Sequence, residues 1–267
     1  MSFSISGKTA IVTGAAHGVG LAIARHFVEQ GARVVLADMD EDALQREAGE
    51  LARDDGPVRL FAGDLRQKLT ITNLLSLTID AFDRIDIVVN AARQVSLTDP
   101  LAADDHSLED LLEQNLMTAY RLSQASARKM IRQGAQTEGA ALGSIINLSS
   151  IAARRTHPQL LAYSVSAAAL DQMTRSMAVA LAPRGIRVNA VAYGSVMSDG
   201  VKGLLKEREG LRAEILSHTP LARIASPAEV SDAVQYLASD ASSFVTGQVI
   251  TVDGGRTLID PAAVTAH

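Results

Sequence analysis

Short apolar runs alternate along the chain with longer segments in which apolar residues recur every three or four positions. The short runs, rich in valine and isoleucine, predict strands at 9–14, 33–38, 58–64, 85–92, 143–150, 186–194 and 248–255. The longer segments predict helices at 19–31, 41–53, 67–82, 107–133, 163–181, 199–217 and from 226 onward. Because the strand runs are apolar at consecutive positions, we expect a sheet buried on both faces.

The alternation of strands and helices predicts an α/β fold, a doubly wound parallel sheet with right-handed crossovers and helices on both faces. The chain has 267 residues, which is within the range of one large α/β domain, so we treat 1–267 as a single domain. The stretch 132–144, rich in glycine, alanine and glutamine, is expected to be an exposed loop.

Composition narrows the class of function. The net charge of −5 argues against nucleic acid or an anionic membrane as the main partner. No apolar stretch reaches the ~18 residues of a membrane span, and the opening residues do not read as a signal peptide. The absence of cysteine excludes disulfides and thiolate chemistry and fits a cytoplasmic location. The six histidines are scattered without metal-ligand spacing, so we expect no metal.

Three glycines, Gly14, Gly18 and Gly20, lie between the first predicted strand and the first predicted helix. A helix N-terminus offers unpaired N–H groups and partial positive charge to a pyrophosphate, and glycine lets phosphate approach the backbone. The strand before the turn and the helix after it are the context that this motif requires. The turn therefore predicts a dinucleotide site.

Acidic residues at the ends of the next two strands bear on the choice of nucleotide. Asp38 can accept both hydroxyls of an adenosine ribose and would repel a 2′-phosphate, which favours NAD(H) over NADP(H). The alternative is a solvated loop acid. Asp64 is placed to meet the adenine edge or to cap a helix. His17 either assists a phosphate when protonated or is a plain turn residue.

A serine, Ser150, ends the fifth strand, and Tyr163 follows thirteen residues later at the start of a predicted helix. With the glycine turn and the phrases "LAPRGIRVNAV" and "TGQVITVDGG", the chain resembles the short-chain dehydrogenase/reductase family. The 3-oxoacyl-carrier-protein reductase and the sugar and steroid alcohol dehydrogenase branches are especially similar. The resemblance implies one Rossmann-type domain with about seven strands, usually a homotetramer. It also implies hydride transfer between NAD(H) and a small-molecule secondary alcohol or ketone.

The resemblance assigns roles to three residues. Ser150 would bind the substrate oxygen, Tyr163 would exchange a proton with it, and Asn115 would hold a water of the proton relay. Ser149 competes with Ser150, which the family's spacing to the tyrosine favours. Asn115 is alternatively an ordinary polar residue of a helix. The implied cofactor contacts are Thr13, Gly14, His17, Gly18, Val19, Gly20, Asp38, Asp64, Leu65, Asn90, Ala91, Tyr163, Gly194 and Val196, with a substrate lid at about 195–218.

The chain departs from the family pattern at three positions: Ala92 stands for glycine, Tyr193 for proline and Ala167 for lysine. An alanine strains a turn that requires positive φ. Tyr193 would bring a ring near the nicotinamide. The family's lysine binds the nicotinamide ribose, and its charge favours the phenolate form of the tyrosine, whose ordinary pKa is about 10.

Without this lysine we expect weakened proton transfer, most of all in alcohol oxidation at neutral pH. Arg154 or Arg155 is an alternative source of positive charge. A second hypothesis is a catalytically impaired NAD-binding protein that serves as a sensor or as a subunit of a hetero-oligomer.

Two further patterns have two interpretations each. An apolar stripe in the helix after Tyr163, formed by Leu170, Met177 and Leu181, either joins two copies in a homo-oligomer, a dimer or a tetramer, or is buried within one chain. Cations of the lid, among them Lys202 and Lys206, either meet an acidic substrate or lie on a solvated helix face.

Overall fold

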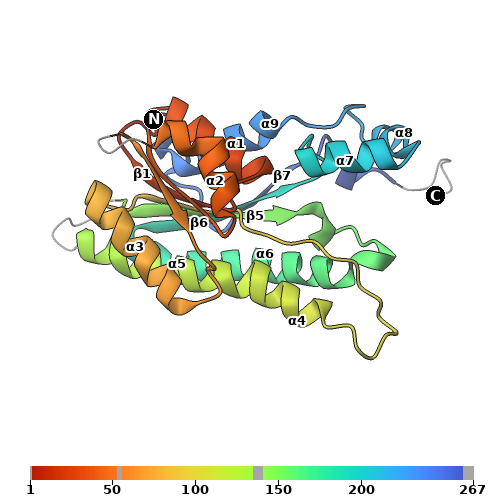
Figure 1. The fold of residues 1–267 in the computed structure, drawn as a ribbon, viewed down its shortest axis with the longest axis horizontal. Coiled ribbons are helices and arrows are strands. Elements are labelled where there is room, and N and C mark those ends of the chain that lie inside the picture. Colours follow the sequence, from red (N-terminus) through yellow and green to blue (C-terminus); the bar gives the residue numbers. More distant parts are fainter. Residues whose placement is uncertain (1, 53–55, 135–140, 261–267) are drawn as a thin grey trace.

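The computed structural model describes residues 2–52, 56–134 and 141–260. At its centre is a seven-stranded sheet of order β3-β2-β1-β4-β5-β6-β7, in which every neighbouring pair is parallel (Figure 1). The strands are β1 (Thr9–Thr13), β2 (Arg33–Asp38), β3 (Val58–Ala62), β4 (Ile87–Asn90), β5 (Gly143–Ser150), β6 (Ile186–Tyr193) and β7 (Val249–Val252). The doubly wound parallel sheet predicted from the sequence is confirmed.

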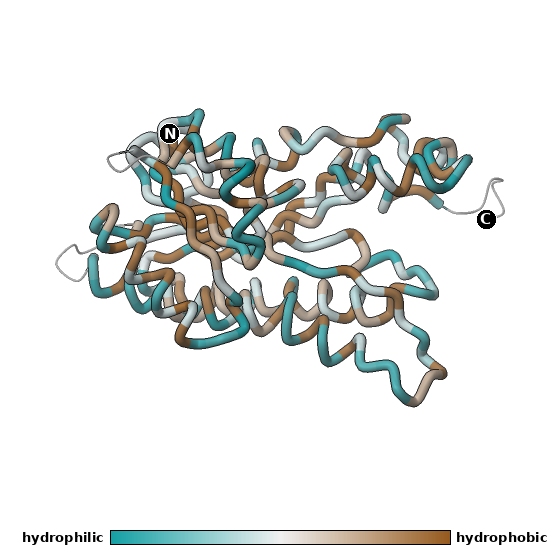
Figure 2. Tube along the Cα trace, in the orientation of Figure 1, coloured by the Kyte–Doolittle hydropathy of each residue, from teal (hydrophilic) through white to brown (hydrophobic). Residues whose placement is uncertain are grey.

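Helices cover both faces of the sheet (Figure 1). One layer holds α1 (Gly18–Glu29), α2 (Glu41–Ala48) and α9 (Pro227–Ala238), and the other holds α3 (Lys68–Phe82), α5 (Thr118–Gln133) and α6 (Leu161–Leu181). Successive residues of a strand point to opposite faces. Val12 therefore packs in the first core cluster and Ile11 in the second. Figure 2 shows the apolar strands lying between the two helix layers.

Some predicted helices are interrupted. The helix expected at 107–133 consists of α4 (Ser107–Leu111), a π-helical turn (Leu112–Met117) and α5. The helix expected at 199–217 divides into α7 (Asp199–Glu207) and α8 (Leu211–Ser217), because Gly210 has a φ of +82° and left-handed backbone ends a helix. Short 3₁₀ turns occupy Gly49–Leu51, Ile151–Ala153, Pro158–Leu160, Ala182–Arg184, Asp240–Ser242 and Arg256–Leu258.

Two expectations concern segments at the edge of the described residues. The helix expected at 41–53 ends at Ala48 and continues as a 3₁₀ turn, and residues 53–55 lie outside the described part. Most of the loop expected at 132–144 also lies outside it, at 135–140.

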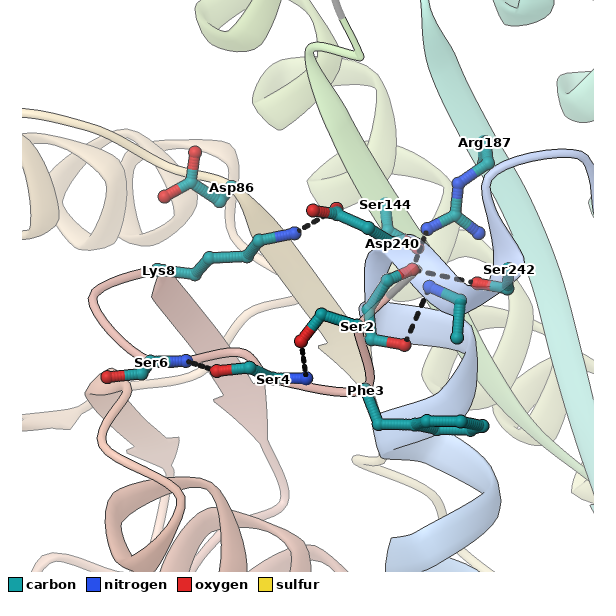
Figure 3. Close-up of polar contacts among 12 residues, drawn as sticks. Ser2, Phe3, Ser4, Ser6, Lys8, Asp86, Ser144, Arg187, Asp240 and Ser242 are labelled. Carbon is teal, nitrogen blue, oxygen red and sulfur yellow. Dashed lines mark hydrogen bonds and ion pairs between the residues drawn. The ribbon is translucent and has the colours of Figure 1, made fainter.

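The amino-terminal segment is attached at the edge of the sheet where the strands begin (Figure 3). Lys8 Nζ lies 2.6 Å from Asp240 Oδ1, and the N–H of Ala241 donates to the carbonyl of Ser2 at 3.1 Å. The Asp86 carboxylate accepts from the N–H of Thr9 at 2.9 Å. These contacts lie at the amino ends of the strands. The carboxyl ends of the strands remain open to ligands, as is usual in open α/β sheets.

The apolar stripe of α6 is buried in part within the chain. Leu170 is 4% exposed, and Met177 and Leu181 are partly buried where they pack against the core cluster on that face of the sheet. Packing within one chain accounts for part of the stripe, and contact with a second copy stays a prediction. Among the described residues, no helix has both the length and the apolar character needed to cross a membrane.

Candidate active site

The glycine turn after β1 is built so closely that side chains would not fit. Gly14 has a φ of +63°, and a Cβ there would lie 2.7 Å from the Cα of Ala92. A Cβ on Gly20 would overlap the carbonyl oxygen of Gly14. The α1 helix begins at Gly18, and its N-cap residue His17 makes no side-chain cap. The first-turn N–H groups therefore remain directed toward a ligand, as a pyrophosphate site requires.

Asp38 lies at the end of β2 beside this turn. Its Oδ2 accepts from the N–H of Ala16 at 3.0 Å, and its Oδ1 accepts from the N–H groups of Met39 at 2.8 Å and Asp40 at 3.2 Å. These bonds fix the carboxylate at the wall of the cleft. A fixed negative charge at this place suits ribose hydroxyls better than a phosphate.

The two other polar candidates at this end already have partners. His17 Nε2 lies 3.1 Å from Asp40, whose pKa is lowered by the N–H of Ala43 and then by His17. Asp64 is held by the Arg66 guanidinium, with Nη2–Oδ2 at 2.8 Å, and that hydrogen bond lowers the pKa of Asp64. The N-cap of α3 is Gln67, so the helix-cap interpretation of Asp64 is wrong.

A cleft of about 520 Å³ lies at the carboxyl ends of the strands, a volume typical of small-molecule sites. The predicted cofactor residues that line it are Gly14, His17, Gly18, Val19, Gly20, Asp38, Asp64, Leu65 and Ala91. Ser198, Asp199 and Gly200 of the predicted lid, and Tyr193 at the end of β6, also line it. Nine of the predicted cofactor residues and Tyr193 therefore lie around one cleft.

Thr13 and Asn90 hold the wall of the cleft from behind. The Thr13 hydroxyl accepts from the N–H groups of Ala91 and Ala92, both at 3.0 Å. Asn90 Nδ2 donates into the interior, to Ser123 at 2.9 Å and Asn147 at 2.8 Å. Only Asp83 and Ala222 among the described non-glycine residues have positive φ. The strain expected at Ala92 is therefore absent.

Gly194 and Val196 do not line the cleft in the described structure. The N–H of Gly194 donates to the carbonyl of Val252 at 3.1 Å, and Val196 forms a β-bridge with Ala225. Both residues begin the segment that leads from β6 to the lid, so they position it instead of forming the wall.

Ser150, Tyr163 and Asn115 meet at one small cavity of about 10 Å³. Ser150 ends β5, and Tyr163 lies in the first turn of α6, which begins at Leu161, two residues earlier than predicted. Ala92 and Arg93 line both this cavity and the cleft, so the two are adjacent. The three residues assigned by the resemblance are thus brought together beside the dinucleotide cleft.

Asn115 is buried within the π-helical turn, where such an irregularity often marks a functional site. Its Oδ1 accepts from the N–H of Gln94 at 2.7 Å, and its Nδ2 donates to the carbonyl of Gln94 at 2.9 Å. The Asn115 side chain is therefore buried and hydrogen-bonded. It anchors the chain that follows β4.

Both candidate serines line the small cavity. The Ser150 hydroxyl accepts from the N–H of Ala152 at 3.1 Å. The Ser149 hydroxyl is buried, and its interaction with Asp171 acts to lower the pKa of that carboxyl against the effect of burial. Because both lie at the cavity, the spacing to Tyr163 remains the basis for choosing Ser150.

The residue that sequence reasoning missed is Arg93. Its Nη1 donates to the hydroxyl of Tyr163 at 2.5 Å, and its Cζ lies 4.3 Å from the centre of the Tyr193 ring. The feature of the sequence that could have indicated Arg93 is its position directly after the Asn90–Ala92 turn. A side chain at that place starts at the carboxyl end of a central strand, where it can extend over the neighbouring strands.

The loop arginines considered as sources of charge lie elsewhere. Arg154 donates to the hydroxyl of Thr251 at 2.9 Å, and Arg155 donates to the carbonyl of Thr257. Both are directed toward β7 and the turn that follows it. The interpretation that one of them stands beside Tyr163 is therefore wrong.

Comparison with known proteins agrees with this geometry. A family profile described as "Enoyl-(Acyl carrier protein) reductase" matches residues 14–257. The chain is 35% identical to a galactitol 2-dehydrogenase (L-tagatose-forming) of Cereibacter sphaeroides, covering 96% of this chain and 97% of that protein. It is 32% identical to a 3-oxoacyl-(acyl-carrier-protein) reductase of Chlamydia trachomatis, covering 96% and 99%.

Among solved structures, a 7α-hydroxysteroid dehydrogenase in complex with NADH and 7-oxo-glycochenodeoxycholic acid superimposes with a TM-score of 0.86. The identity is 30%, and 95% of each chain is covered. The match of a family profile to nearly the whole chain, the parallel seven-stranded sheet and the shared identity with these enzymes lead to one conclusion. This chain belongs to the short-chain dehydrogenase/reductase family of oxidoreductases.

Proposed function

We propose that this protein is an NAD(H)-dependent oxidoreductase that interconverts a secondary alcohol and a ketone. The observation that carries the proposal is the meeting of Ser150, Tyr163 and Asn115 at one small cavity, next to a cleft with a glycine turn and an acid. Similarity to a galactitol 2-dehydrogenase and to a 7α-hydroxysteroid dehydrogenase supports it.

The described residues fit a nicotinamide dinucleotide. Gly14 and Gly20 let the turn close against the chain's own backbone, and α1 begins at Gly18 with no side-chain cap, which suits a phosphate. Asp38 offers a fixed carboxylate for ribose hydroxyls. When bound, the cofactor supplies the hydride acceptor or donor. Asp38 supports NAD(H) over NADP(H), because its charge repels a 2′-phosphate.

The chain's own residues supply the proton chemistry. The Tyr163 hydroxyl lies at the cavity and gives a proton to the substrate oxygen in reduction, or takes one in oxidation. The Ser150 hydroxyl binds the same oxygen and orients it. Asn115 holds the chain around Gln94 in place, and its position beside Tyr163 suits a relay of water to the surface.

A second candidate function rests on Ala167. No lysine stands on α6 four residues after Tyr163, and this favours a protein that binds NAD(H) but has impaired catalysis. Such a protein would act as a sensor of the nucleotide or as a subunit of a hetero-oligomer.

A binding titration followed by a turnover screen distinguishes the two candidates. NADH fluorescence gives the affinity, and panels of ketones and secondary alcohols are then tested in both directions. Turnover that disappears in Tyr163→Phe supports the oxidoreductase. Tight binding without turnover on any substrate supports the second candidate, and no binding of NADH or NADPH contradicts both.

We also infer a homo-oligomer. Val165 and Val179 of α6 are 42% and 78% exposed, and apolar side chains on one helix suit contact with a second copy. Size-exclusion chromatography with light scattering tests this. A monomer at micromolar concentration would contradict it.

A further inference from the structure

We propose that Arg93 is the positioning residue that supplies, from the turn after β4, the positive charge that Ala167 lacks on α6. The proposal rests on the oxidoreductase function proposed above. Its basis is the hydrogen bond of 2.5 Å from Arg93 Nη1 to the hydroxyl of Tyr163. A charged donor at that distance stabilises the phenolate more than the neutral phenol.

The three departures from the family pattern meet at this guanidinium. Ala167 and Arg93 line the same small cavity, where the short side chain of alanine leaves the hydroxyl of Tyr163 open to a donor from another element. Tyr193 presents its ring 4.3 Å from Arg93 Cζ, within the range of a cation–π contact. A proline at position 193 would offer no such face.

The third departure, Ala92, directly precedes Arg93. Its N–H and that of Ala91 donate to the Thr13 hydroxyl, which fixes the backbone from which the Arg93 side chain extends. The Arg93 side chain is thus fixed at its backbone end by the turn and at its guanidinium end by the Tyr193 ring. This is the arrangement expected of a group whose position matters.

The charge on Arg93 is secure. Burial disfavours this charge, but attraction to the ionised forms of Tyr193 and Tyr163, together with the hydrogen bond to Tyr163, outweighs burial, so the pKa of Arg93 lies above its usual value. Burial raises the pKa of Tyr193, so this phenol stays neutral beside Arg93. An arginine also remains charged throughout the pH range in which tyrosines ionise.

The other titratable groups around the two cavities have partners elsewhere, or lie away from Arg93. The groups with partners are His17 with Asp40, Asp38 with three backbone N–H groups, Asp64 with Arg66, Glu113 with Arg121, and Asp199 with Lys202. The remaining group is Asp171 of α6. Burial raises the pKa of Asp171, and the positive charges of Arg154 and Arg175 act to lower it. Arg93 is therefore the cation whose removal should change the ionisation of Tyr163.

The first test needs no cofactor. The chain has four tyrosines and no tryptophan, so near-ultraviolet absorbance follows phenolate formation cleanly. Because Arg93 also lies against Tyr193, each variant is compared with the same variant carrying Tyr163→Phe, and the difference isolates Tyr163. In Arg93→Met this component should move to higher pH, and in Arg93→Lys it should return toward the wild type. Arg155→Met, which removes an arginine at the same end of the sheet, should leave it in place. Arg93→Gln replaces Arg93→Met if that variant does not fold.

The second test is the pH–rate profile. Loss of a cation near a titrating group is worth about 1–3 pH units, so alcohol oxidation near pH 7 should fall ~10- to 1,000-fold in Arg93→Met and recover as pH rises. The KM for NAD⁺ should change far less than kcat. An unchanged titration and profile would overturn the proposal. So would tighter NADH binding with faster turnover, which would mean that Arg93 obstructs the site. If the wild type never turns over but the titration moves, the proposed function fails and the role of Arg93 stands.

Discussion

The carboxylate of Asp38 accepts a hydrogen bond from the N–H of Ala16, 3.0 Å away, and so joins the end of β2 to the glycine turn. In Asp38→Asn the negative charge is removed while one side-chain oxygen remains as an acceptor. We expect NADH to bind about 10- to 100-fold more weakly, because hydrogen bonds to a charged group contribute about 1.5–3 kcal/mol. NADPH should bind no worse, or better. Fluorescence titration with both nucleotides measures the ratio.

The exposed acid Asp42 at the start of α2 provides the control. Asp42→Asn removes the same charge from the same end of the molecule and should leave the ratio of the two affinities unchanged. If both variants change the ratio of the NADH and NADPH affinities equally, long-range charge determines the preference for NADH, and the contact at Asp38 does not.

Gly14 and Gly7 form a matched pair. Both have positive φ, +63° and +74°, but a Cβ on Gly14 would lie 2.7 Å from the Cα of Ala92, whereas one on Gly7 would meet nothing within 4 Å. Each Gly→Ala change carries the cost of left-handed backbone, about 1–2 kcal/mol. Only Gly14→Ala should also push the two turns apart and abolish NADH binding. Urea unfolding of both variants measures the cost of the backbone strain, and NADH titration measures the effect of the clash at Gly14. Equal NADH affinity in the two would contradict the close approach.

Glu229 links stability to pH. The Arg223 guanidinium, at 2.6 Å, and the N–H of Ser226 lower the pKa of Glu229 to about 2. An unfolded glutamate has a pKa of about 4.3, so this carboxylate stabilises the fold above that value and loses its effect as pH falls toward 2. Because the pair is partly exposed, we expect less than about 1 kcal/mol. The free energies of unfolding of wild type and Glu229→Gln, measured in urea, should differ at about pH 7 and converge as pH falls toward 2. A difference in the free energy of unfolding that grows as pH falls would contradict the lowered pKa of Glu229.

The pattern of the chain predicts the fold well, and it identifies the glycine turn and Asp38 that line one cleft, because both depend on local features. The glycine turn needs only its strand and helix, and Asp38 needs only the end of a strand. The features that the sequence did not predict depend on packing between distant segments. The π-helical turn holds Asn115, whose side chain binds the backbone of Gln94 from a distant segment. Likewise, Arg93 and Tyr163 are 70 positions apart, and no local pattern pairs them.

Replacing Ala167 with lysine tests how the two sources of charge relate. If Tyr163 had no cation, Ala167→Lys would raise turnover in both directions. With Arg93 already at the hydroxyl, the cavity of about 10 Å³ at Ala167 has no room for a second long side chain. We therefore expect Ala167→Lys alone to leave alcohol oxidation unchanged or to lower it. Combined with Arg93→Met, however, the same lysine should restore about 10-fold or more of the lost rate.

Such non-additivity is what a double-mutant cycle detects when two groups serve one site. Steady-state kcat for the four proteins, with stability checked by urea unfolding, completes the cycle. Additive effects would mean that Arg93 and a lysine at 167 act on different groups. A large gain from Ala167→Lys in the presence of Arg93 would mean that the guanidinium does not assist Tyr163.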